Sequence, residues 1–263
     1  MSRVSGPTDQ SFKQQLRDCL SFLRHPSLSR ALPHSPPVSS WFSDWIPAVR
    51  FKRLLAWAGM LWLINIFALG PIVLAVFEMS GATHRINVNN LPWFQAIIWA
   101  PIVEELLFRF GLRRPLQAVW MIPLLVVVLL NGMVWWSSCL LVATIAMCLW
   151  SSHASNGPGD WSWMWLRRYR VVFPYVFHLV ALVFAAVHIK NFIFVEVDWW
   201  MMVVLVAPQW VTGLVLGWMR VKRGIVSAML LHGIFNAGPL LVAFIALQFA
   251  RSEERRVGKE CLR

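Results

Sequence analysis

The stretch WAPIVEELLFRF, residues 99–110, places two carboxylates and one guanidinium inside a strongly apolar part of the chain. An ionised side chain near the centre of a bilayer costs about 2.5 to 3.5 kcal/mol even on a lenient insertion scale, so these groups need partners or a function. Glu105 and Arg109 are spaced i, i+4 with the acid on the amino-terminal side, which favours an ion pair along one helix. Glu104 lies about 100° away around that helix without a partner at this spacing, so it is a candidate general base.

Pro101 lies three residues before Glu104 and has no N–H to donate to the carbonyl of Ile97. We therefore expect a kink and a free backbone acceptor near Glu104, where water could enter. The competing interpretation is a buried Glu105–Arg109 pair that only tightens helix packing.

Two further polar clusters occur in apolar stretches. In FAAVHIKN, Phe184 and His188 share a helix face, and in LHGIFNA, His232 and Asn236 do the same. Each histidine, like Glu104, lies far enough from its expected helix end, roughly 12 to 18 Å at 1.5 Å per residue, to reach the middle of a membrane. The sequence therefore predicts that these groups form one site.

The composition indicates an integral membrane protein. Of the 263 residues, 58% are hydrophobic and 14% are charged, and the mean hydropathy is +0.60. We expect an all-α fold, a polytopic transmembrane helix bundle with about six to eight membrane helices. The candidate spans are residues 54–79, 92–112, 121–150, 171–197, 199–219 and 225–250. The stretch 121–150 is interrupted by Asn131-Gly132, so it is either one long tilted helix or a re-entrant hairpin.

The chain has a net charge of +12, and clusters of Lys and Arg lie beside the expected spans, at residues 50–53, 113–114 and 220–223. This placement follows the positive-inside rule, puts the amino terminus in the cytoplasm and argues against a nucleic-acid partner. The cysteines have no C-x-x-C spacing, so neither a disulfide framework nor a zinc site is indicated.

We divide the chain into three parts. Residues 1–50 are interpreted as a cytoplasmic amphipathic helix, on an anionic leaflet or as a weak soluble helix, followed by a Pro/Ser linker. Residues 51–250 form the membrane domain. The abrupt charged tail 251–263, RSEERRVGKECLR, resembles the translation of a sequencing adapter, and we leave it out of fold reasoning.

Three motifs occur in order within the apolar helices: EExxxR (Glu104, Glu105, Arg109), FxxxH (Phe184, His188) and HxxxN (His232, Asn236). Together they resemble the CPBP family of CAAX-protease and bacteriocin-processing membrane proteins, which includes the type II CAAX prenyl endopeptidases. The stretch 213–236, GLVLGWMRVKRGIVSAMLLHGIFN, is similar to the penultimate loop and last core helix of that family. The resemblance covers a motif core of residues 92–250, with an atypical insertion at about 115–170.

This resemblance implies an intramembrane glutamic endopeptidase that uses neither a cofactor nor a metal. Glu104 is then the base that deprotonates a water, and His188 helps to hold that water. His232 and Asn236 donate hydrogen bonds to the oxyanion, a role in which one donor is worth about 10² to 10³ in rate. The resemblance implies an orienting role for the remaining motif residues, Glu105, Arg109 and Phe184.

The expected partners are membrane lipids and a membrane-associated protein or peptide substrate, and the expected location is a bacterial inner membrane.

One departure from the family is Phe110, which separates the motif arginine from Gly111 and puts a close helix contact in doubt. Two alternatives remain. Glu104, His188 and His232 could bind a divalent metal, or the protein could be a noncatalytic immunity factor or scaffold.

Overall fold

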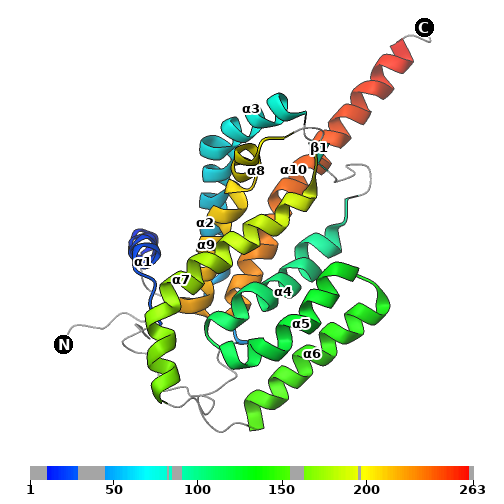
Figure 1. The fold of residues 1–263 in the computed structure, drawn as a ribbon. Helices are drawn as coiled ribbons and strands as arrows, with labels where there is room; N and C mark the ends of the chain where they lie inside the picture. Colours follow the sequence, from blue (N-terminus) through cyan, green and yellow to red (C-terminus); the bar gives the residue numbers. More distant parts are fainter. Residues whose placement is uncertain are drawn as a thin grey trace, which may run out of the picture.

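The computed structural model describes residues 11–28, 45–81, 83–84, 91–154, 163–194 and 197–260. Helices make up nearly all of this part of the chain, and the strands Thr83–His84 (β1) and Phe192–Ile193 (β2) form one short antiparallel pair (Figure 1). The predicted all-α class is confirmed.

Fewer stretches than expected are suited to crossing a membrane. Among the described residues, three helical runs are long and apolar enough: Phe51–Ser80, Arg167–Asn191 and Ile225–Phe249. The helices Trp199–Leu205 (α8) and Ala207–Arg223 (α9) pass the same test only as a pair, with a bend of 47° between them. This gives three, or up to four, candidate spans, and the expectation of about six to eight is not confirmed.

The outer surface of these helices is apolar. Large side chains such as Phe67, Leu74 and Val242 are 72%, 64% and 66% exposed. Contiguous apolar surface of this kind marks contact with a membrane or a partner. Together with the candidate spans, it indicates an integral membrane protein.

The long run Phe51–Ser80 consists of the helix Phe51–Leu63 (α2), a π-helical segment Ile64–Leu69 (η2) and the helix Gly70–Ser80 (α3). The helix Trp163–Val187 (α7) ends in the 3-10 turn His188–Asn191 (η6), so it stops before the residue 197 that hydropathy predicted. The helix Ile225–Glu260 (α10) continues through most of the charged tail, but its candidate span, Ile225–Phe249, ends one residue before the predicted residue 250. Residues 261–263 lie outside the described residues.

Helix α10 packs against α2 and α9, and α9 packs against α7. Aromatic side chains fill the space between them, including Trp57, Phe173, Phe177 and Trp218, each at most 1% exposed. This core fixes α7 and α10, which carry the two motif histidines.

The segment that carries Glu104 is an irregular helix of four pieces: π-helical Gln95–Trp99 (η3), α-helical Ala100–Glu104 (α4), π-helical Glu105–Arg109 (η4) and 3-10 Phe110–Leu112 (η5). The irregularity has a local cause, because Pro101 cannot donate to the carbonyl of Ile97. The expected interruption near Pro101 is present, and π-helical turns of this kind often occur at functional sites.

The stretch 121–150 is not a single long helix. The helices Pro115–Asn131 (α5) and Trp135–Ala154 (α6) form a hairpin beside α4 (Figure 1). Gly132, between them, adopts a φ of 69° that suits glycine, and the Oγ of Ser137 donates to its carbonyl at 2.5 Å. The re-entrant alternative is therefore the correct one in shape, and the apolar helices Pro115–Asn131 and Trp135–Ser151 are too short to be candidate spans.

The amphipathic helix predicted near the amino terminus is Phe12–Arg24 (α1). Most of its apolar face is buried, because Cys19 and Phe22 are only 2% and 4% exposed, whereas Leu20 is 50% exposed. The ring of Phe22 contacts Phe177 of α7, and the indole of Trp57 donates to Gln15 at 3.2 Å. Helix α1 is therefore part of the bundle, whereas most of the predicted linker lies outside the described residues.

Candidate active site

A fully buried ion pair lies at the centre of the site. The Nη1 of Arg109 donates to the Oε1 of Glu105 at 2.5 Å, and the two side chains are 1% and 0% exposed. The guanidinium also stacks on the Phe184 ring, 3.9 Å from its centroid. The ion pair predicted from the i, i+4 spacing is therefore confirmed, and α7 provides the aromatic surface that holds it.

His232 of α10 contacts both glutamates of the motif. Its Nδ1 lies 2.9 Å from Glu105 Oε1, and its Nε2 lies 3.7 Å from Glu104 Oε2. Because the Glu105 carboxylate is paired with Arg109, it accepts the hydrogen bond, so we infer that Nδ1 carries the proton. In the neutral imidazole, Nε2 then presents a lone pair to Glu104.

His188 is held in the same tautomer by a different acceptor. Its Nδ1 lies 2.7 Å from the Phe184 carbonyl oxygen, which can only accept. Its ring packs on the Phe184 ring at 4.6 Å, and its Nε2 lies 3.9 Å from Glu104 Oε2. The end of α7 at Val187, followed by the turn η6, places this ring at the site rather than on the outer face of the bundle.

Glu104 Oε2 therefore faces the Nε2 atoms of both histidines. This oxygen is buried and has no hydrogen-bond partner among the described residues, although the side chain as a whole is 15% exposed. Distances of 3.7 and 3.9 Å exceed a direct hydrogen bond but allow one water to contact the oxygen and either nitrogen from the side. The arrangement suits a carboxylate that exchanges protons with a water.

Asn236 connects α10 to the irregular helix. Its Nδ2 donates to the carbonyl of Ala96 at 2.9 Å, which leaves the second amide proton for another acceptor. One turn earlier, Gly233 lies so close to the carbonyl of Ile97 that a Cβ at Gly233 would be 2.5 Å from the oxygen. The Ile97 carbonyl, to which Pro101 cannot donate, is thus covered by α10, with the small glycine allowing the approach.

The sequence interpretation missed Arg220 and Gly213 of α9. Arg220 was assigned to a juxtamembrane cluster, yet it is 0% exposed and donates to the carbonyls of Arg109 and Phe110, each at 3.3 Å. Gly213 lies against the Phe184 ring and Arg109 Nη2, where an added Cβ would be 3.1 and 3.5 Å away. Gly213 and Arg220 are spaced so that they lie on the same face of α9. This spacing could have identified both residues from the sequence.

The remaining geometry bears on the alternatives. The described residues contain no group of three or more His, Cys, Asp and Glu side chains placed to hold a metal ion, so we derive no metal-dependent step. The sequence put a close helix contact at Gly111 in doubt. In the structure, a Cβ added at Gly111 would be 2.9 Å from the Cβ of Ala118. A close contact exists at this position, but it is made with α5 of the insertion.

Part of the chain is similar to a known protein family. Residues 160–238 match the family model described as Type II CAAX prenyl endopeptidase Rce1-like. No curated protein and no solved structure matches the chain. The matched region contains the FxxxH and HxxxN motifs and does not include EExxxR. The chain is therefore similar, through the helices that carry both motif histidines, to the CAAX prenyl endopeptidases, as the ordered motifs predicted.

Proposed function

We propose that this protein is an intramembrane endopeptidase of the glutamic type, in which Glu104 activates a water for attack on a peptide bond. The observation that carries the proposal is the position of Glu104 Oε2, buried and 3.7 and 3.9 Å from the Nε2 atoms of His232 and His188. The similarity to CAAX-type membrane proteases gives the reaction class.

In the proposed reaction, a water between Glu104 and His188 gives one proton to the Glu104 carboxylate as its oxygen bonds to the substrate carbonyl carbon. The carbonyl π electrons move to the oxygen, which forms a tetrahedral oxyanion. Collapse of this intermediate breaks the C–N bond, and the protonated Glu104 returns its proton to the leaving amine. The carboxylate is then regenerated, and one water is consumed for each bond cut.

The oxyanion must be stabilised by hydrogen-bond donors, and the tautomer of His232 decides which of its nitrogen atoms can donate. Because the Nδ1 proton of His232 is committed to Glu105, its Nε2 can donate only in the imidazolium form. We therefore propose that His232 donates to the oxyanion as an imidazolium. The second amide proton of Asn236 is the other proposed donor.

The proposed substrates are membrane-associated proteins or peptides that present a cleavable bond to this lipid-shielded site. The proposed location is a bacterial inner membrane with the amino terminus in the cytoplasm, because basic residues precede the first span and the positive-inside rule favours that orientation.

The test compares cleavage by the wild type and by Glu104→Gln in liposomes, followed by proteomics of membrane fractions from cells that express each form. We expect Glu104→Gln to lower the rate by at least about 10² to 10⁴-fold, the usual contribution of a general base. The matched control is Glu78→Gln, which makes the same change at an exposed position of α3 and should keep full activity. Undiminished cleavage by Glu104→Gln would refute the mechanism, and no cleavage by the wild type would favour a noncatalytic role.

A further inference from the structure

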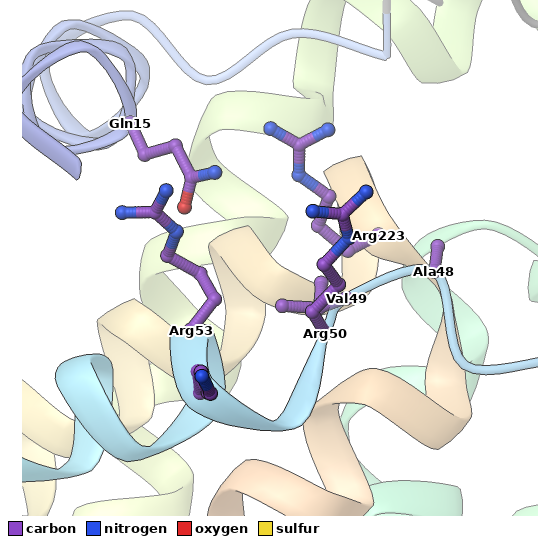
Figure 2. Close-up of a pocket in the computed structure, with 7 residues that line it drawn as sticks. Gln15, Ala48, Val49, Arg50, Arg53 and Arg223 are labelled. Atoms are coloured by element: carbon purple, nitrogen blue, oxygen red, sulfur yellow. The ribbon is translucent and has the colours of Figure 1, made fainter. Parts of the chain in front are cut away.

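A second feature of the molecule is a cavity of about 300 Å³ that shares no lining residue with the Glu104 site. Figure 2 shows side chains from three separate parts of the chain around it. Helix α1 provides Gln15, the segment before α2 provides Ala48 and Val49, and the cations are Arg50, Lys52, Arg53 and Arg223.

The walls of this cavity are held by hydrogen bonds. The Ala48 N–H donates to Ser227 Oγ at 3.1 Å, and that hydroxyl donates to the carbonyl of Arg223 at 2.9 Å. Gln15 is fixed by the indole of Trp57. Gln15 and Arg223 are only 5% and 7% exposed, so two polar side chains are buried at the cavity rather than extended into solvent.

The lining residues carry four positive charges and no carboxylate. Helix α2 begins here with no acidic residue in its first turn, so the positive end of its dipole adds to the same field. The carboxylate of Asp18 in α1 acts electrostatically on Arg223 and Lys222. The four cations that line the cavity favour an anion as its ligand.

The position of the cavity indicates which anion. Arg50, Lys52 and Arg53 lie at the start of the candidate span Phe51–Ser80, and Arg223 ends the bent pair α8–α9, so the cavity lies where helices leave the membrane. Lipid phosphates occupy this level of a bilayer, and Arg and Lys side chains there attract anionic headgroups. We propose that the cavity binds the phosphate of an anionic lipid headgroup, with Arg50 and Lys52 contacting it from the exposed side and Arg223 from the buried side.

The experiment measures lipid binding to the delipidated full-length protein in nonionic detergent by native mass spectrometry, with phosphatidylglycerol and phosphatidylcholine as probes. We expect wild type to retain phosphatidylglycerol preferentially and Arg50→Gln/Lys52→Gln to lose affinity by about 5- to 30-fold, as expected for two interfacial cations. Asp18→Asn should tighten binding. The matched control, Arg167→Gln/Arg168→Gln, removes two exposed cations that do not line the cavity and should keep wild-type affinity.

Three outcomes would overturn the proposal. An equal loss of affinity for phosphatidylglycerol in Arg167→Gln/Arg168→Gln would mean that net charge, not this cavity, attracts the lipid. Equal retention of phosphatidylcholine would exclude selection for an anionic headgroup. Displacement of phosphatidylglycerol by an equimolar amount of inorganic phosphate would identify a free-phosphate site instead. Thermal unfolding of each variant is recorded beside binding, and Arg50→Lys, which keeps the charge, must restore affinity relative to Arg50→Gln.

Discussion

His232 Nδ1 and Arg109 Nη1 contact the same oxygen of Glu105, at 2.9 and 2.5 Å. One carboxylate therefore joins the last helix, α10, to the irregular helix that contains Glu104. The same contact selects the tautomer of His232, so packing and proton placement depend on one side chain.

Replacing Glu105 with glutamine should be strongly destabilising. The new amide oxygen could still accept from His232, but the buried Arg109 would lose the carboxylate that it is paired with, a loss of about 3 to 5 kcal/mol. The measurement is denaturant unfolding of Glu105→Gln in micelles, with Glu78→Gln as the control because that side chain is exposed. Equal stability of the two variants would show that the Glu105–Arg109 pair contributes little.

His232→Ala should lower the rate of cleavage by about 10² to 10³-fold in the liposome assay, because it removes a proposed oxyanion donor. His178→Ala is the matched control, since His178 lies on α7 and its ring packs on Phe177 at 5.3 Å, outside the Glu104 cluster. Both variants must insert and elute as wild type. Retained activity in His232→Ala would remove this residue from the mechanism.

Gly233→Ala and Gly59→Ala should change stability in opposite directions. At Gly233 the new Cβ would meet the Ile97 carbonyl oxygen at 2.5 Å, so α10 must move away from η3 and strain the Asn236–Ala96 hydrogen bond. At Gly59, inside α2, nothing lies within 4 Å, so alanine should gain up to about 1 kcal/mol from helix propensity. Thermal unfolding of both variants checks the contrast, and a neutral Gly233→Ala would mean that the helices are not so close.

The Cys19 thiol should resist alkylation while α1 is packed on the bundle. Burial, with a smaller contribution from the charge of Asp18, raises the pKa of Cys19 to about 12, so at pH 8 only about one thiol in ten thousand is the reactive thiolate. Phe22→Ala removes the contact with Phe177, so it should speed the labelling of Cys19 by maleimide. The labelling rate is measured by mass spectrometry of the α1 peptide. Fast labelling of wild-type Cys19 would contradict the packing of α1.

The parts that the sequence predicted well are local. The Glu105–Arg109 pair follows from the spacing along one helix, and the break near Ile97 follows from the missing N–H of Pro101. The adjacency of Glu104, His188 and His232 could be expected because polar groups in apolar helices lower their cost by gathering.

The parts that it did not predict depend on tertiary packing. Hydropathy treats Arg220 as one of three interfacial cations, yet it is buried and donates to carbonyls of η4 and η5. Composition also cannot distinguish one tilted helix from the α5–α6 hairpin. The docking of α1 likewise depends on Trp57 and Phe177, which are far away in sequence.

The α5–α6 hairpin has a consequence for the membrane surface beside it. At 1.5 Å per residue, the 17 residues of α5 measure about 26 Å, shorter than hydrocarbon of about 30 Å. A hairpin that turns back instead of crossing brings both of its ends to the same membrane surface. Since the hairpin lies beside α4, we expect that surface to be close to Glu104 on this side, and the water of the proposed reaction would enter from there.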